Sequence, residues 1–167
     1  MAKKKSNNLA KYFPFATIVL SILAFVMLFL PAIVTKEAKL DTDYSGFQLA
    51  FGYKEMHGKE VTILSFSFMN FLTVLLPLVA LVLTALNSFG KKQNKLFTLL
   101  AAICLAVAGV FFFMSLNFAS FNKPEKWVEV LWYIPKDGFK LGIGAILGGV
   151  FSLLGALASF ASLVMNK

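Results

Sequence analysis

The stretch LGIGAILGGVFSLLGALASFASLV, residues 141–164, contains no charged side chain and carries a small residue at every third or fourth position. At helical spacing these positions share one face, while Leu, Ile, Val and Phe cover the rest. In water, each glycine would cost such a helix about 1 kcal/mol relative to alanine. In a bilayer, backbone groups have no other partner and small faces allow close packing. The stretch therefore predicts a transmembrane helix whose packing face comprises Gly144, Gly148, Ser152, Gly155 and Ser159.

The rest of the composition agrees with a membrane protein. Of the 167 residues, 59% are hydrophobic, above the roughly 45–50% of soluble domains, and the mean hydropathy is +0.78. Three further uncharged runs predict helices at about residues 12–34, 65–87 and 96–118, each long enough to cross a hydrocarbon core of about 30 Å. The sequence thus predicts an all-α integral membrane protein, a four-transmembrane-helix bundle forming a single domain over residues 1–167.

The loops between these helices differ in character. Residues 36–62 and 119–140 are the predicted outer loops, and residues 88–95 the inner loop. Within the first outer loop, large apolar residues alternate with small or polar ones, a period typical of a half-buried strand, and a second alternation begins at Val61. We therefore expect a small β-hairpin in this loop, with His57-Gly58 at its turn. The first alternation consists of Phe47, Leu49, Phe51 and Tyr53.

Charge predicts the orientation. All 16 basic residues are lysines, against 8 acids, and every acid falls in the two outer loops. The two sides tie at eight lysines each, but four of the inner lysines precede the first helix and the inner segments contain no acid, so we expect both termini inside a bacterial plasma membrane. The excess charge would then contact anionic headgroups of the inner leaflet. Its distribution, and the lack of arginine, argue against a nucleic-acid partner. The inner-face lysines are Lys3, Lys4, Lys5, Lys11, Lys91, Lys92 and Lys95.

No pattern indicates reaction chemistry. The predicted spans contain no acid, lysine or histidine, which argues against ion-coupled transport. The sequence has no nucleophile elbow and no phosphate-binding loop, and its single cysteine, Cys104, lies in an apolar run. His57 has no second ligand at metal-binding spacing. We therefore expect no enzymatic activity, no cofactor and no metal.

We predict an accessory, structural or scaffolding subunit that docks a protein partner, or a second copy, through its outer loops. One alternative is a passive channel or transporter component formed by oligomerisation through the glycine-rich fourth helix. A weaker one is a membrane enzyme, which would need Asp41, Asp43 and Glu55 to converge on a cleft. The aromatic residues predicted to dock a partner are Phe47, Phe51, Tyr53, Trp127, Trp132 and Tyr133.

The overall plan of four helices, a longer β-prone first outer loop and a shorter second one is similar to that of claudin-type tetraspan proteins. The first loop departs from the W…GLW…C…C pattern of that family, since it contains neither tryptophan nor cysteine. The resemblance therefore concerns the outline of the chain, and it implies no role for any residue.

Overall fold

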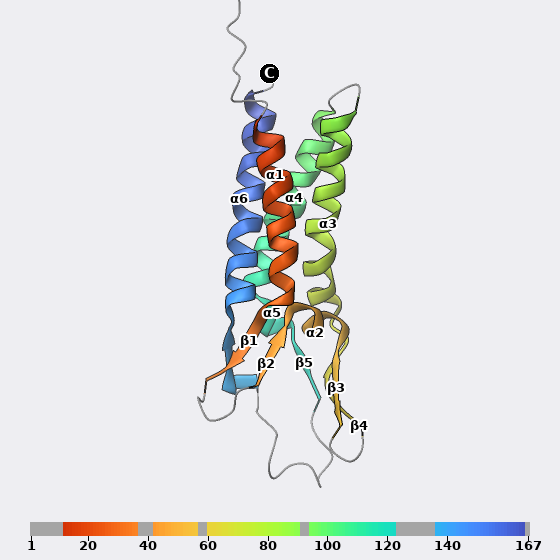
Figure 1. Ribbon diagram of the computed structural model, residues 1–167, viewed down its shortest axis with the longest axis vertical. Helices are drawn as coiled ribbons and strands as arrows, with labels where there is room; N and C mark the ends of the chain where they lie inside the picture. Colours follow the sequence, from red (N-terminus) through yellow and green to blue (C-terminus); the bar gives the residue numbers. More distant parts are fainter. Residues whose placement is uncertain (1–11, 37–41, 57–59, 91–93, 123–135, 166–167) are drawn as a thin grey trace, which may run out of the picture.

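The computed structural model describes residues 12–36, 42–56, 60–90, 94–122 and 136–165. Its long helices run alternately up and down, and a smaller region of short strands lies at one end of the bundle (Figure 1). Four helical segments of 18 to 23 residues are long and apolar enough to cross a membrane. They are α1 (Tyr12–Val26) with its 3-10 continuation η2 (Met27–Phe29), α3 (Phe68–Phe89), α4 (Lys95–Phe113) and α6 (Ile143–Met165).

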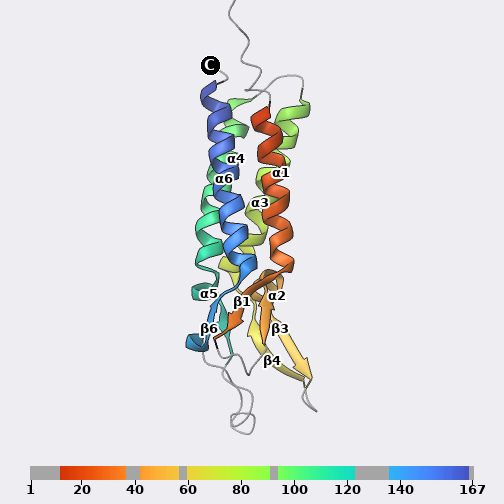
Figure 2. The same cartoon turned by 60° about the vertical axis from the view of Figure 1, so that its left-hand side comes forward.

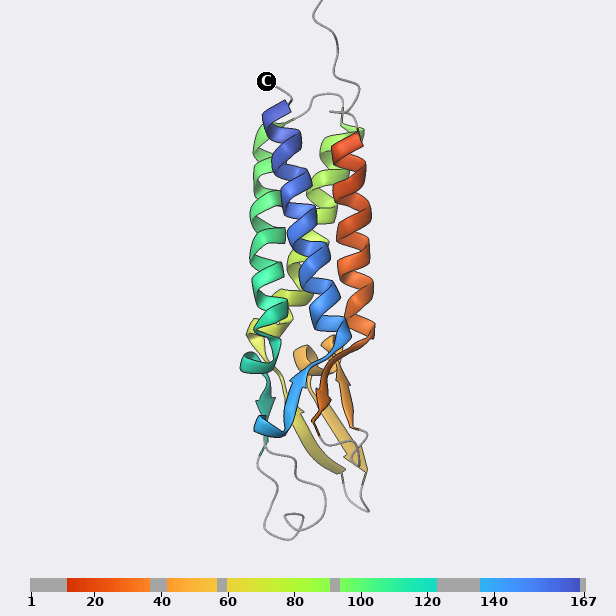
Figure 3. The same ribbon diagram turned by 90° about the vertical axis from the view of Figure 1, so that its left-hand side faces the viewer.

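The four helices form a closed ring. Helix α6 lies between α1 and α4 (Figure 3), and α3 completes the ring by packing against both α1 and α4 (Figure 2). All neighbours in the ring are therefore antiparallel. The end where α1 begins and α6 finishes is called the terminal end below, and the opposite end the strand end.

Many of the side chains inside the ring are small, packed around a few large ones such as Leu105 and Phe112. Ala24, Ala80, Ala101 and Ala145 are all 0% exposed. Large apolar side chains lie on the outside instead; Leu157, for example, is 66% exposed. This pattern is the reverse of a soluble bundle, and it lets the helix backbones approach closely.

At the strand end the chain forms two antiparallel three-stranded sheets. The first has the order β2-β1-β6, from Asp43–Ser45, Pro31–Thr35 and Phe139–Leu141, and the second the order β3-β4-β5, from Tyr53–Met56, Glu60–Ser65 and Ser120–Phe121. Strand β1 follows α1 directly and β6 leads into α6, with Ile33 opposite Leu141. The first sheet therefore extends the α1–α6 pair beyond the bundle. Three short helical segments complete the fold: α2 (Gly46–Phe51), α5 (Ser115–Phe118) and η3 (Lys136–Gly138).

The predicted helix limits need correction where strands begin. The first helix, predicted over residues 12–34, ends at Phe29, because Leu30 precedes Pro31 and adopts an extended backbone with ψ of 161°. The second begins at Phe68 rather than 65, since residues 60–65 form β4. The third, predicted over 96–118, is interrupted at Met114, and the fourth begins at Ile143 rather than 141.

The prediction of an all-α fold is wrong in part, because two small sheets are present. Strands β3 and β4 do pair as an antiparallel hairpin. However, the first predicted strand is wrong over residues 46–51, which form helix α2. The apolar residues Phe47, Ala50 and Phe51 also fit helical spacing, and Ser45 supplies a helix cap. The predicted turn at His57-Gly58 lies outside the described residues.

Candidate docking surface

Helix α2 is fixed in place at the junction between the bundle and the sheets. Ser45 and Gln48 form a capping box: Gln48 N–H donates to Ser45 Oγ (3.3 Å), and Ser45 N–H donates to Gln48 Oε1 (2.8 Å). Gly46 packs so closely that a Cβ there would lie 3.2 Å from Leu28 Cα. Gly52 ends the helix at φ 91°, a conformation that favours glycine. The capping box and Gly52 fix the two ends of α2, and the contact of Gly46 with Leu28 places its first residue against η2.

One face of α2 carries Phe47 and Phe51, whose rings stack with centroids 6.2 Å apart. Phe47 also meets Phe29 at 4.7 Å and Phe25 at 5.8 Å, both from the end of α1. Phe51 meets Phe71 of α3 at 5.7 Å. The helix thus links rings from α1 and α3 into one surface. We call this surface the aromatic face; it comprises Phe25, Phe29, Phe47, Phe51, Phe66 and Phe71.

Half of the aromatic face is open to the surroundings. Phe29 is 64% exposed, Phe66 is 55% and Phe51 is 54%. A contiguous exposed apolar patch of this kind marks an interaction site in many proteins. The sequence pattern identified Phe47 and Phe51 but missed Phe25, Phe29, Phe66 and Phe71. Those four lie in runs assigned to the predicted spans or their ends, where phenylalanine is ordinary. Pro31, soon after Phe29, was the one available signal that the helix stops there.

Tyr53, also predicted to dock a partner, lies elsewhere. It packs against Tyr44 with ring centroids 5.6 Å apart, and Tyr44 packs against Phe139 at 5.8 Å. Phe139 in turn stacks on Phe121 at 5.1 Å. Tyr44 and Phe139 belong to the first sheet, Tyr53 and Phe121 to the second. These four rings therefore join the two sheets, and Tyr53 is part of their common core.

Burial at this core changes the acidity of Tyr44. The side chain is 5% exposed. Loss of solvation, with smaller contributions from the charges of Glu55 and Tyr53, raises the pKa of Tyr44 to about 12. The phenol therefore stays neutral throughout the physiological range.

Several predicted site residues lie outside the described part of the chain. They are Trp127, Trp132 and Tyr133 of the second outer loop, and Lys3, Lys4, Lys5, Lys11, Lys91 and Lys92. Lys95 is described and is the first residue of α4, at the terminal end.

The small residues of α6 lie inside the bundle. A Cβ on Gly144 would come within 2.7 Å of the carbonyl oxygens of Met27 and Leu30, and one on Gly148 would overlap the ring of Phe112. Ser159 Oγ donates to the carbonyl oxygen of Thr98 on α4 (2.9 Å). Helix α6 thus uses this face against α1 and α4 of the same chain. The buried positions are Gly144, Gly148, Ser152, Gly155 and Ser159.

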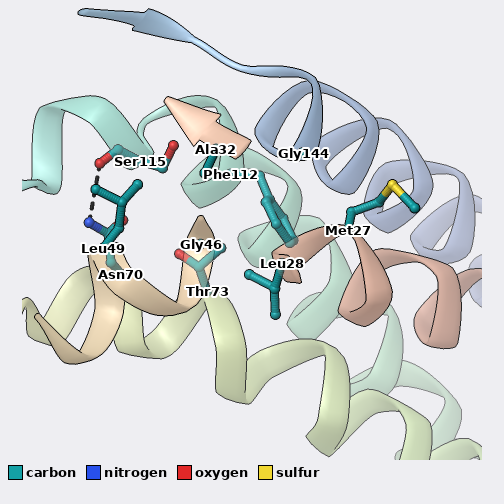
Figure 4. A pocket seen from close by; sticks show the side chains of 10 residues that line it. All are labelled: Met27, Leu28, Ala32, Gly46, Leu49, Asn70, Thr73, Phe112, Ser115 and Gly144. Atoms are coloured by element: carbon teal, nitrogen blue, oxygen red, sulfur yellow. Dashed lines mark hydrogen bonds between the residues drawn. The ribbon is translucent and has the colours of Figure 1, made fainter. Parts of the chain in front are cut away.

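A cavity of about 10 Å³ lies beneath α2, between the helices (Figure 4). Asn70 Nδ2 donates to the carbonyl oxygen of Ser115 (3.2 Å) beside it. Within the described residues, Asn70 Oδ1 and Ser115 Oγ are buried without a hydrogen-bond partner. The volume corresponds to about one water molecule, so the cavity is too small for a substrate.

In the described ranges, no three His, Cys, Asp or Glu side chains are grouped so that they could hold a metal ion. No protein-family model matches the sequence, and no curated protein matches it either.

Proposed function

We propose that this chain is a multi-pass protein of the plasma membrane, with both termini in the cytoplasm. We propose further that it acts as a non-enzymatic accessory or structural subunit, which docks a membrane-protein partner on the aromatic face. The exposed rings of Phe29, Phe51 and Phe66 are the observation that carries this proposal.

The outer surface of the bundle supports the membrane placement. Large apolar side chains are exposed on every long helix, such as Val19 (54%), Val82 (55%) and Ile103 (51%). A water-soluble protein seldom exposes apolar surface of this extent. Lipid chains around the four helices would cover it.

Charge supports the orientation. At the strand end, the four described lysines are balanced by four described acids. At the terminal end, Lys95 is the one described charged residue. The inner loop and the N-terminal segment add further lysines and no acid. Lysine number alone does not decide the side, since each side carries eight; the four lysines ahead of the first helix and the acid-free inner segments favour a cytoplasmic terminal end. The residues at the strand end are Lys36, Lys54, Lys136, Lys140, Asp43, Glu55, Glu60 and Asp137.

The chemistry of the aromatic face supports docking. Residues that anchor a protein at the headgroup level are usually Trp and Tyr, which have a polar tip. All six rings of the aromatic face are phenylalanine, without such a tip. Rigid aromatic side chains lose little entropy on binding and are enriched at the centres of protein interfaces. The aromatic face therefore suits an apolar segment of a partner, at the depth where the helices give way to the sheets.

Site-specific cross-linking tests the docking role. A photo-cross-linking amino acid is placed at Phe51 and, as a matched control, at Phe15, which is similarly exposed (54% and 58%) but near the terminal end. In native membranes we expect position 51 to yield one adduct of defined mass, and position 15 to yield none. The same partner should copurify in detergent and be lost on Phe51→Ala. If the protein remained monomeric and positions 51 and 15 gave the same cross-linking result, the docking role would be contradicted.

The alternative function is a pore assembled through the glycine face of α6. Those positions are buried against α1 and α4 of the same chain, so an oligomeric pore would need another face. Flux from protein reconstituted in liposomes distinguishes the two functions, because a docking subunit alone should conduct nothing.

A further inference from the structure

An open groove of about 470 Å³ lies on the outside of the bundle at the terminal end. One wall comes from the first turns of α4 and the other from the last turns of α6. Its lining is apolar except for one lysine at the start of α4. The lining residues are Lys95, Leu96, Leu99, Phe160, Leu163 and Val164.

The groove results from a small residue beside a large one. Ser159 is buried and lets α6 approach α4, through its hydrogen bond to the carbonyl oxygen of Thr98 (2.9 Å). The next residue, Phe160, points outward and is 54% exposed. The two helices therefore approach closely at Ser159, and the large side chains on either side of this contact line the groove.

The beginning of α4 is held firmly at the mouth of this groove. Asn94 Oδ1 accepts from Leu96 N–H (3.0 Å), capping the helix. Asn87, at the end of α3, donates from Nδ2 to Thr98 Oγ1 (2.9 Å). Leu99 lies one turn below Lys95, about 6 Å along the helix axis. The lysine thus stands at the mouth, and the apolar walls extend below it.

Among the described residues, Lys95 has no acidic neighbour. All eight acids lie in segments 37–60 and 125–137, and the described ones are at the strand end. The described part of the chain therefore leaves a cation at the end of an apolar groove, with no acid beside it.

We propose that this groove binds an anionic phospholipid of the inner leaflet. The phosphate accepts hydrogen bonds from the Lys95 ammonium group, and an acyl chain lies along Leu99, Phe160 and Leu163. A free phosphate would leave the apolar walls uncovered, and a zwitterionic lipid would leave the lysine charge unbalanced. The inference rests on the proposed membrane placement, and it does not depend on partner docking.

Native mass spectrometry of the purified full chain tests this site. The protein in detergent is mixed with dioleoyl phosphatidylglycerol or dioleoyl phosphatidylcholine, and bound lipid is counted. We expect retention of the anionic lipid to be preferred. Lys95→Gln should lower that retention about five-fold, the equivalent of about 1 kcal/mol for one lysine near an anionic surface. Lys140→Gln, a change at the strand end, should leave it unaltered.

A second variant tests the walls of the groove. Leu99 is 39% exposed, so Leu99→Trp fills the groove without disturbing the bundle core. Leu99→Trp should lower retention of the anionic lipid although Lys95 is intact. If Lys95→Gln aggregates, Leu99→Trp still tests the groove by itself. Glycerol phosphate, which has no acyl chain, should not displace the lipid.

Three results would overturn the lipid site: equal retention of both lipids, equal losses from Lys95→Gln and Lys140→Gln, or displacement by glycerol phosphate. Loss of the lipid preference with an intact cross-link at Phe51 would reject this site alone. Loss of the cross-link with the lipid preference intact would reject the docking role alone.

Discussion

The glycines of α6 are required by what they touch. A Cβ at Gly148 would overlap the ring of Phe112, which is 2% exposed and has little room to move. We expect Gly148→Leu to lower the free energy of unfolding by about 1–3 kcal/mol or more through overpacking. Denaturant titration in a mild detergent, followed by circular dichroism, measures this change.

The matched control adds bulk on the outside of the same helix. Val150 is 39% exposed, so the larger side chain of Val150→Phe should be accommodated with little effect. Equal losses of stability from Gly148→Leu and Val150→Phe would contradict the packing role of the glycine.

The raised pKa of Tyr44 predicts that the free energy of unfolding depends on pH in a way that can be measured separately. Its pKa is raised to about 12 from 10.0, so between these values the folded state holds a proton that the unfolded state has released. Its contribution to the free energy of unfolding is therefore fully present below pH 10 and is lost as pH rises toward 12; over the whole window the loss is of order 3 kcal/mol.

The free energy of unfolding of wild type and of Tyr44→Phe is compared between about pH 9 and about pH 12, the range over which the folded and unfolded states differ in protonation of Tyr44. The comparison separates the effect of Tyr44 from that of other titrating groups. The stability of the variant should fall less steeply with pH. In wild type, the absorbance change of one tyrosine should occur later than that of the others. Identical pH slopes for the two proteins would show that Tyr44 is solvated.

At the scale of elements, the start of α3 holds the end of the α4–α5 segment. Ser67 caps α3, accepting from Asn70 N–H, and its Oγ donates to the carbonyl oxygen of Phe118 (2.7 Å). Ser67→Ala removes both interactions. We expect a loss of about 1–2 kcal/mol of stability, measured by the same denaturant titration.

Ser21→Ala is the appropriate control for this change. Ser21 is also buried, but its hydroxyl donates to the carbonyl oxygen of Thr17 within its own helix (2.8 Å). Its removal should therefore cost much less. If both substitutions had the same effect, the contact between α3 and α5 would contribute nothing beyond an ordinary buried serine.

Elements with a long apolar run could be predicted from the sequence, and their ends could not. A run without charges specifies where a helix can exist, but β1 is apolar as well, so residues 31–34 were assigned to the first helix. The turn from helix to strand depends on Pro31 and on pairing with β6, more than 100 residues away. Pairing at that distance leaves no periodic signal in either segment.

The error over residues 46–51 has a different cause. Six residues allow both a period of two and a helical spacing, and only the capping box of Ser45 and Gln48 decides between them. Small residues recur over many turns of α6, so the sequence predicts one packing face but not whether it packs within the chain or between copies; in the bundle those positions are buried against α1 and α4. The aromatic face could not be predicted, because its rings come from α1, η2, α2, α3 and the residue Phe66 that precedes α3, and they meet only in three dimensions.

At the scale of the whole molecule, charge and burial give the same account. Large apolar side chains cover the outside of four long helices, many of the buried positions are small, and the described acids lie at one end. Each proposed site depends on this placement: the aromatic face lies where the helices meet the sheets, and the lipid groove lies where the chain is purely basic.

Cysteine accessibility in intact cells tests this placement most directly. In a Cys104→Ala background, a membrane-impermeant maleimide is applied to Glu60→Cys and Asp137→Cys at the strand end, and to Asn94→Cys at the terminal end. We predict that the first two react in intact cells and that Asn94→Cys reacts only after permeabilisation. Reaction at Asn94→Cys in sealed cells, or a chain that stays soluble without detergent, would contradict the account.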